Sequence, residues 1–79
     1  MQMQIFVKTF DGKVLSLDLE PTATIEGLKA KLEAKYGVRA DSQNIVYAGK
    51  VLENHKTLAE NNIKNDSALY LVIRLSGGF

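Results

Sequence analysis

Two alternating segments on either side of a turn constrain the fold of this chain more than any other feature. The segment "MQIFVKT" (3–9) alternates strictly, and "VLSLDLE" (14–20) alternates again after Asp11-Gly12. Period two is typical of half-buried strands, and Asp-Gly is typical of a tight hairpin turn. We therefore predict a β-hairpin, whose inward side chains are Met3, Ile5, Val7, Thr9, Leu15, Leu17 and Leu19.

A helix is predicted after the hairpin. Pro21 cannot donate to a strand ladder and ends the second strand. Thr24 is a favoured N-cap residue, and Glu26 suits the first turn because the helix dipole favours negative charge there. Gly37 can close the helix in the left-handed conformation. The expected apolar stripe is Ile25, Leu28 and Leu32, and the charged residues assigned to other faces are Lys29, Lys31, Glu33 and Lys35.

The second half of the chain is predicted to complete a sheet. Residues 43–52 indicate a short strand, a turn at Ala48-Gly49 and a shorter strand. Residues 57–63 indicate one helical turn with a loop, anchored by Leu58 and Ile63, and residues 68–75 form the last strand. The predicted fold class is α+β: a mixed sheet with one helix packed across one face, in a single domain.

Composition excludes several classes of function. The 79 residues contain no cysteine, so disulfides and thiolate metal sites are excluded. A formal charge of +1 without a polybasic stretch argues against nucleic-acid and membrane-surface binding. No apolar run approaches the roughly 20 residues of a bilayer span, and no signal peptide is recognised. We expect a monomer without a cofactor, located in the cytoplasm and nucleus.

One face of the predicted sheet carries more apolar side chains than a solvent-facing surface needs. A single helix covers only one face, yet Phe6, Val46, Tyr70 and Val72 lie in the outward register of their strands, and Phe10 lies at the hairpin tip. Scattered exposed apolar residues are ordinary, but several on one open face indicate a binding patch.

Several segments are similar to the ubiquitin family. They include "MQIFVKT" at 3–9, "TIE" at 24–26, "AGK" at 48–50, and "LV", "RL" and "GG" near the carboxyl end. They fall in register without a gap from Met3 to Gly78. The resemblance implies the β-grasp fold, with residues 1–2 as an N-terminal extension, 3–74 as the domain and 75–79 as a flexible tail.

In that family a C-terminal Gly-Gly carboxylate is adenylated, passed to a cysteine as a thioester, and joined to a target lysine by an isopeptide bond. The matching residues are Gly77 and Gly78, whose lack of side chains suits a narrow enzyme channel. Phe79 follows them and resembles the short extension that a processing protease removes from family precursors. The alternative is a chain that is never processed.

The resemblance also assigns recognition residues. The family's hydrophobic patch maps onto Phe10, Val46 and Val72, with Tyr70 beside it. These residues would bind ubiquitin-receptor domains; otherwise they are ordinary strand residues on a poorly covered face. Arg74 matches the tail arginine read by the ubiquitin-activating enzyme. At two further positions, positive charge is lost, since Ser76 and Asn44 stand where the family has arginines.

The family's chain-forming lysines map onto six residues. Each is otherwise a solvated charge, and Lys29 is otherwise a partly buried structural residue. Asn65 stands where a further acceptor is expected, and the neighbouring Lys64 is not its equivalent, because a one-residue shift in a turn redirects the side chain. The matching residues are Lys8, Lys13, Lys29, Lys31, Lys35 and Lys50.

The sequence supports three classes of function unequally. An enzyme is rejected, because the only histidine, His55, lies in a polar loop without a partner, and the carboxylates show no metal-ligand spacing. A modifier served by activating, conjugating and ligating enzymes is preferred. A non-covalent ubiquitin-like domain and a divergent or engineered ubiquitin remain open alternatives.

Overall fold

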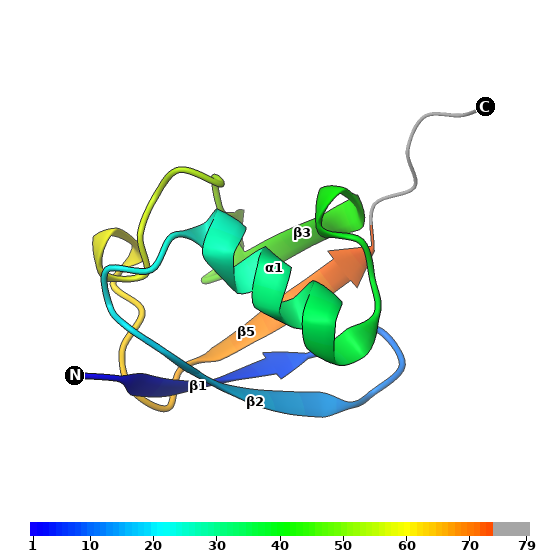
Figure 1. Cartoon of the computed structure of the whole chain (residues 1–79), viewed down its shortest axis with the longest axis horizontal. Coiled ribbons are helices and arrows are strands. Elements are labelled where there is room, and N and C mark those ends of the chain that lie inside the picture. Colours follow the sequence, from blue (N-terminus) through cyan, green and yellow to red (C-terminus); the bar gives the residue numbers. More distant parts are fainter. Residues whose placement is uncertain (74–79) are drawn as a thin grey trace.

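A computed structural model describes residues 1–73, and they form one sheet with a helix packed across it (Figure 1). The strands of the sheet run in the order β2-β1-β5-β3-β4, and the central pair β1 and β5 is parallel while the other pairs are antiparallel. The elements are β1 (Met3–Lys8), β2 (Val14–Leu19), α1 (Ile25–Tyr36), η1 (Ala40–Ser42), β3 (Gln43–Tyr47), β4 (Lys50–Val51), η2 (Ala59–Asn61) and β5 (Ala68–Ile73).

The helix begins and ends where the sequence predicts. The Thr24 side chain accepts a hydrogen bond from the backbone N–H of Gly27 at 3.1 Å, which satisfies one of the free amides of the first turn. At the other end Gly37 adopts φ +85°, and its N–H donates to the Glu33 carbonyl. Glycine enters this left-handed region at the lowest steric cost, so α1 stops there.

The core lies between α1 and the facing side of the sheet. The expected stripe is buried, and it meets the inward residues of the hairpin and of β5. Leu58 and Ile63 close the end of the core beneath η2, as expected. The buried hydrophobic residues are Ile5, Val7, Leu17, Leu19, Ile25, Leu28, Leu32, Ile45, Leu52, Leu58, Ile63, Leu69 and Leu71.

Most of the predicted elements are confirmed, with two corrections. The α+β sheet, the hairpin, the Ala48-Gly49 turn and the order of elements match the prediction. The assignment of Lys29 to a face away from the apolar stripe is wrong, because this side chain is only 8% exposed. The short helix η1 was not predicted; its amide at Ala40 is held by the Glu33 carboxylate at 2.9 Å.

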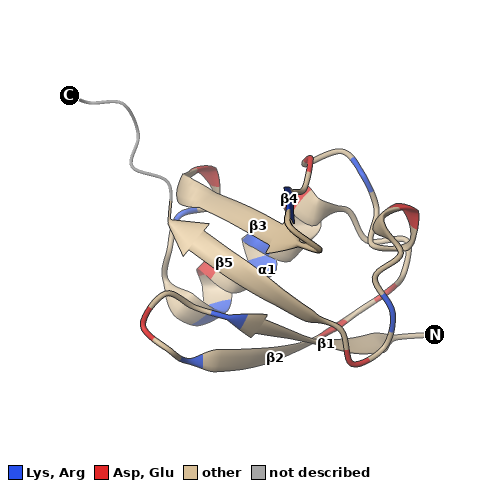
Figure 2. Cartoon of the chain, turned by 180° about the vertical axis from the view of Figure 1, so that it is seen from behind, with Lys and Arg blue, Asp and Glu red and all other residues tan. Residues whose placement is uncertain are grey.

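Within residues 1–73, the face of the sheet that turns away from α1 carries no helix (Figure 2). Strands β3 and β5 contain no charged residue along their lengths, so their outward side chains form a neutral surface. This open face is where the candidate site lies.

Candidate interaction surface and conjugation sites

Three of the four predicted patch residues lie together on β3 and β5. Val46 pairs directly with Tyr70 across the two strands, and Asn44 pairs with Val72. Cross-strand partners project from the same face of a sheet, so these side chains are neighbours. Tyr70 is 50% exposed, Val72 is 46% exposed, and Val46 is half-buried. The structure therefore brings Val46, Tyr70 and Val72 into one surface, with the neutral amide of Asn44 at its rim.

The same row of side chains continues onto β4 and β2, beyond the residues that the sequence predicts. Val46 pairs with Val51 on β4, and Tyr70 pairs with Lys8 on β1, which in turn pairs with Val14 on β2. Val51 and Val14 are both more than half exposed. The register of a two-residue turn at Ala48-Gly49 is the signal that could have identified Val51, since it places Val51 opposite Val46.

Phe10, the fourth patch residue, is 70% exposed in the β1–β2 turn. The turn is closed by backbone bonds from the Thr9 N–H to the Lys13 carbonyl at 2.8 Å and from the Gly12 N–H to the Thr9 carbonyl at 3.1 Å. Gly12 has φ +87°, which explains a glycine at this position. Phe10 thus belongs to a hydrogen-bonded turn that follows β1, the strand that pairs with β5.

Asp11 organises the same turn. Its carboxylate accepts hydrogen bonds from the Thr9 hydroxyl and, at 2.9 Å, from the Tyr36 hydroxyl at the end of α1. The bond from Thr9 is the main cause that lowers the pKa of Asp11 below its usual value, and the Tyr36 bond and the nearby Lys13 charge act in the same direction. Asp11 is therefore ionised in the folded protein at neutral pH.

The six predicted acceptor lysines are not equivalent. Lys29 is buried, and its ammonium donates to the Asn54 side-chain oxygen at 2.6 Å. Its carbonyl accepts from the Gln43 side chain, which also donates to the Val38 carbonyl and joins α1 to β3. Lys29 therefore occupies a structural position, the alternative that the sequence left open.

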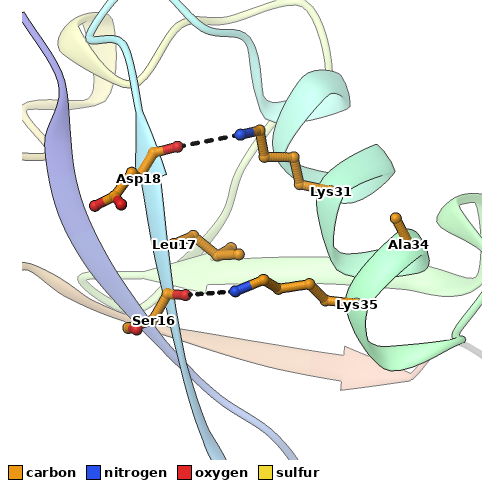
Figure 3. A pocket seen from close by; sticks show the side chains of 6 residues that line it. All are labelled: Ser16, Leu17, Asp18, Lys31, Ala34 and Lys35. Atoms are coloured by element: carbon orange, nitrogen blue, oxygen red, sulfur yellow. Dashed lines mark hydrogen bonds between the residues drawn. The ribbon is translucent and has the colours of Figure 1, made fainter.

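Lys31 and Lys35 lie one turn apart on α1 and reach across a groove of about 400 Å³ to β2 (Figure 3). The Lys31 ammonium donates to the Asp18 carbonyl at 3.2 Å, and the Lys35 ammonium donates to the Ser16 carbonyl at 3.3 Å. Strand β2 is at the edge of the sheet, so these lysines satisfy carbonyls that would otherwise face solvent.

The other three lysines are exposed at the surface. Lys13 lies over the Tyr36 ring, with its ammonium 5.7 Å from the ring centroid. Lys8 and Lys50 lie on β1 and β4. Asn65 stands in the position of the missing acceptor. Its side-chain oxygen accepts a hydrogen bond from the backbone N–H of Gln4 at 2.8 Å, so Asn65 has a structural role in the turn before β5.

The predicted conjugation and processing residues lie outside the described residues. These are Arg74, Gly77, Gly78 and Phe79. Within residues 1–73, no group of three or more His, Asp or Glu side chains could hold a metal ion. His55 is exposed, with its ring nitrogen 3.9 Å from the Glu53 carboxylate. Helix α1 does not meet the length and hydropathy that a membrane span needs, nor does any other helix in that range.

A helix packed on one face of a mixed five-stranded sheet, with parallel central strands and an apolar open face, defines a β-grasp domain. Comparison with known proteins identifies the family of this domain. A model of the ubiquitin family matches residues 5–76, and the chain belongs to that family.

The relatives include two kinds of protein. NEDD8-like protein RUB3 of Arabidopsis thaliana is 41% identical over 76 residues, and ubiquitin-like protein NEDD8 of Dictyostelium discoideum is 37% identical over 76 residues. Each alignment covers 96% of this chain and 97% or 99%, respectively, of the relative. UV excision repair protein RAD23 homolog B of Homo sapiens is 30% identical over 74 residues, which are 90% of this chain but 18% of that protein.

Proposed function

We propose that this protein is a modifier that is conjugated to lysines of target proteins through the carboxylate of Gly78, after a protease removes Phe79. The observation that carries the proposal is the alignment with NEDD8-like proteins over 97–99% of their lengths, together with Gly77-Gly78 in this chain. Its partners are activating, conjugating and ligating enzymes, a processing protease, and target lysines in the cytoplasm and nucleus. The protein itself performs no catalysis.

We also propose that the modifier is recognised through the open face of its sheet. Phe10, Val46, Tyr70 and Val72 form the surface that ubiquitin-receptor domains recognise. A partner gains most from desolvating a central apolar cluster, and the pairing of Val46 with Tyr70 provides such a centre. Asn44 at the rim is neutral where the ubiquitin family has an arginine, so this surface lacks a positive charge that would steer partners. Charges at the rim of an interface act mainly on association rates.

The test compares three chains that end at Gly77, Gly78 and Phe79. Each is incubated with ATP and either a ubiquitin-activating or a NEDD8-activating enzyme, because the aligned relatives are NEDD8-like while Arg74 resembles the ubiquitin tail. Thioester formation is read by non-reducing gel and intact mass. Charging of the Gly78 form alone is the expected result. If neither enzyme charges it, conjugation by these pathways is refuted.

The non-covalent alternative rests on the alignment with RAD23 homolog B, of which the matched region is a minor part. A domain of that kind binds receptors and is never charged. Receptor binding by the full chain, combined with failure of the Gly78 form to charge, would favour this alternative.

A further inference from the structure

The turn that carries Phe10 is fastened to the far end of α1. Residues 9–13 connect β1 to β2, and Tyr36 is the last residue of α1. Figures 1 and 2 both place this turn beside the end of the helix that precedes Gly37. The Tyr36 hydroxyl donates to the Asp11 carboxylate at 2.9 Å, although 25 residues separate the two positions.

Tyr36 is suited to hold the turn because its ring is itself held. The ring is half-buried and packs against the core, so it offers its hydroxyl from a fixed position. Two residues of the turn contact it from either side of Gly12: Asp11 accepts from the hydroxyl, and the Lys13 ammonium lies over the ring at 5.7 Å. Cation–π contact and a charge-assisted hydrogen bond thus act on the same side chain.

Asp11 transmits this attachment to Phe10. The carboxylate oxygen that accepts from Tyr36 also accepts from the Thr9 hydroxyl, so the residues on both sides of Phe10 are tied to one point. The Thr9 hydroxyl in turn accepts from the Lys13 amide at 3.0 Å. Phe10 projects from this bonded frame and is exposed to a partner.

We propose that Asp11 and Tyr36 are positioning residues for Phe10: their hydrogen bond fixes the β1–β2 turn before a partner with an apolar pocket binds it. This inference rests on the proposed receptor-binding patch. A turn that is already ordered loses less conformational entropy on binding, so affinity is higher than for the same side chains on a loose turn.

The test uses Tyr36→Phe, which keeps the ring that Lys13 and the core contact and removes only the hydroxyl. Tyr47→Phe is the matched control, since Tyr47 is also half-buried against the core but lies on β3. Amide hydrogen exchange and NMR relaxation of Asp11, Gly12 and Lys13 are measured without a partner. We expect faster exchange and larger amplitudes in Tyr36→Phe alone.

The second measurement is the affinity for a purified ubiquitin-associated domain by titration, with Phe10→Ala as reference. We expect Tyr36→Phe to bind about three- to tenfold more weakly, as for the loss of one hydrogen bond, and Tyr47→Phe to be unchanged. Asp11→Ala should weaken binding at least as much, because it also removes the bond from Thr9. The double variant should show little loss beyond that of Asp11→Ala, because Tyr36 acts through the Asp11 carboxylate.

The outcomes separate the two proposals. An equally rigid turn in Tyr36→Phe overturns the positioning role directly. A looser turn with unchanged affinity, while Phe10→Ala weakens binding, also overturns it and leaves the patch in place. Unchanged binding by Phe10→Ala refutes the contact between Phe10 and receptors, and with it any effect on binding of the hydrogen bond between Tyr36 and Asp11.

Discussion

Lys29 should be the least reactive of the six candidate acceptor lysines in the folded protein. Its side chain is 8% exposed, and its ammonium donates to Asn54 at 2.6 Å, whereas Lys50 is exposed on β4. For the amine to attack an acyl group, it must leave Asn54 and swing out of its buried position. A hydrogen bond to a charged group contributes about 1.5–3 kcal/mol. Since about 1.4 kcal/mol is a factor of ten, we expect acylation of Lys29 to be about 10–100-fold slower than that of Lys50.

Limited acetylation with an N-hydroxysuccinimide ester, followed by peptide mapping by mass spectrometry, measures this ratio without any enzyme. Asn54→Ala should reduce the difference in acetylation rate between Lys29 and Lys50. Lys29 should still react more slowly than Lys50, because its side chain remains buried. Asn44→Ala is the matched control and should leave the ratio unchanged. In denaturant all six lysines should react alike. Equal acetylation of Lys29 and Lys50 in the native protein would show that the burial and the Asn54 bond do not protect the amine.

Three further predictions follow from the geometry. Val46→Ala should weaken binding of a ubiquitin-associated domain by about 1–2 kcal/mol, the value of one or two buried methylene equivalents. Val14→Ala, at the far end of the row, should change the affinity little. Titration calorimetry measures both affinities. The pKa of Asp11 is lowered in the folded state, so its contribution to stability is complete above the unfolded pKa of about 3.9 and is lost as pH falls through the lower folded value. Thr9→Ala removes the main cause, so an NMR titration of the carboxyl carbon should show the Asp11 pKa rising toward its usual value. Ile45→Ala, at a fully buried position, should lower the free energy of unfolding by about 2–5 kcal/mol in urea denaturation, without altering the fold of the variant.

Local patterns were sufficient to predict the elements of this fold, with the exception of η1. Strict alternation around Asp11-Gly12 defined the hairpin, and Thr24 and Gly37 marked the ends of α1, because capping depends on residues within one turn. The burial of Lys29 was also present in the pattern: positions 25, 28, 29 and 32 follow the spacing of one buried helix face. Because Lys29 is charged, it was assigned to an exposed face. Its hydrogen bond to Asn54 explains how the charged side chain can instead be buried.

The site was predicted less completely, for a physical reason. Strand register determines which side chains are neighbours, and register becomes visible only when the pairing of strands is known. The pairs that join Lys8 to Tyr70 and Tyr70 to Val46 connect strands that are distant in sequence. The bond between Tyr36 and Asp11 likewise spans 25 residues. No local pattern encodes such contacts.

The positions of the lysines determine whether a protein joined to one of them would cover the apolar patch. Lys31 and Lys35 bond to the edge strand β2 from α1, on the side of the sheet that the helix occupies. Lys8 instead pairs with Tyr70 and projects from the open face. A protein joined to Lys8 would therefore stand beside Tyr70 and compete with a receptor for the patch, whereas one joined to Lys35 would leave the patch accessible. If Lys8 serves as an acceptor, linkage at Lys8 and recognition of the patch would be coupled through strand register, because a single row across the sheet holds both the Lys8 amine and the apolar side chains.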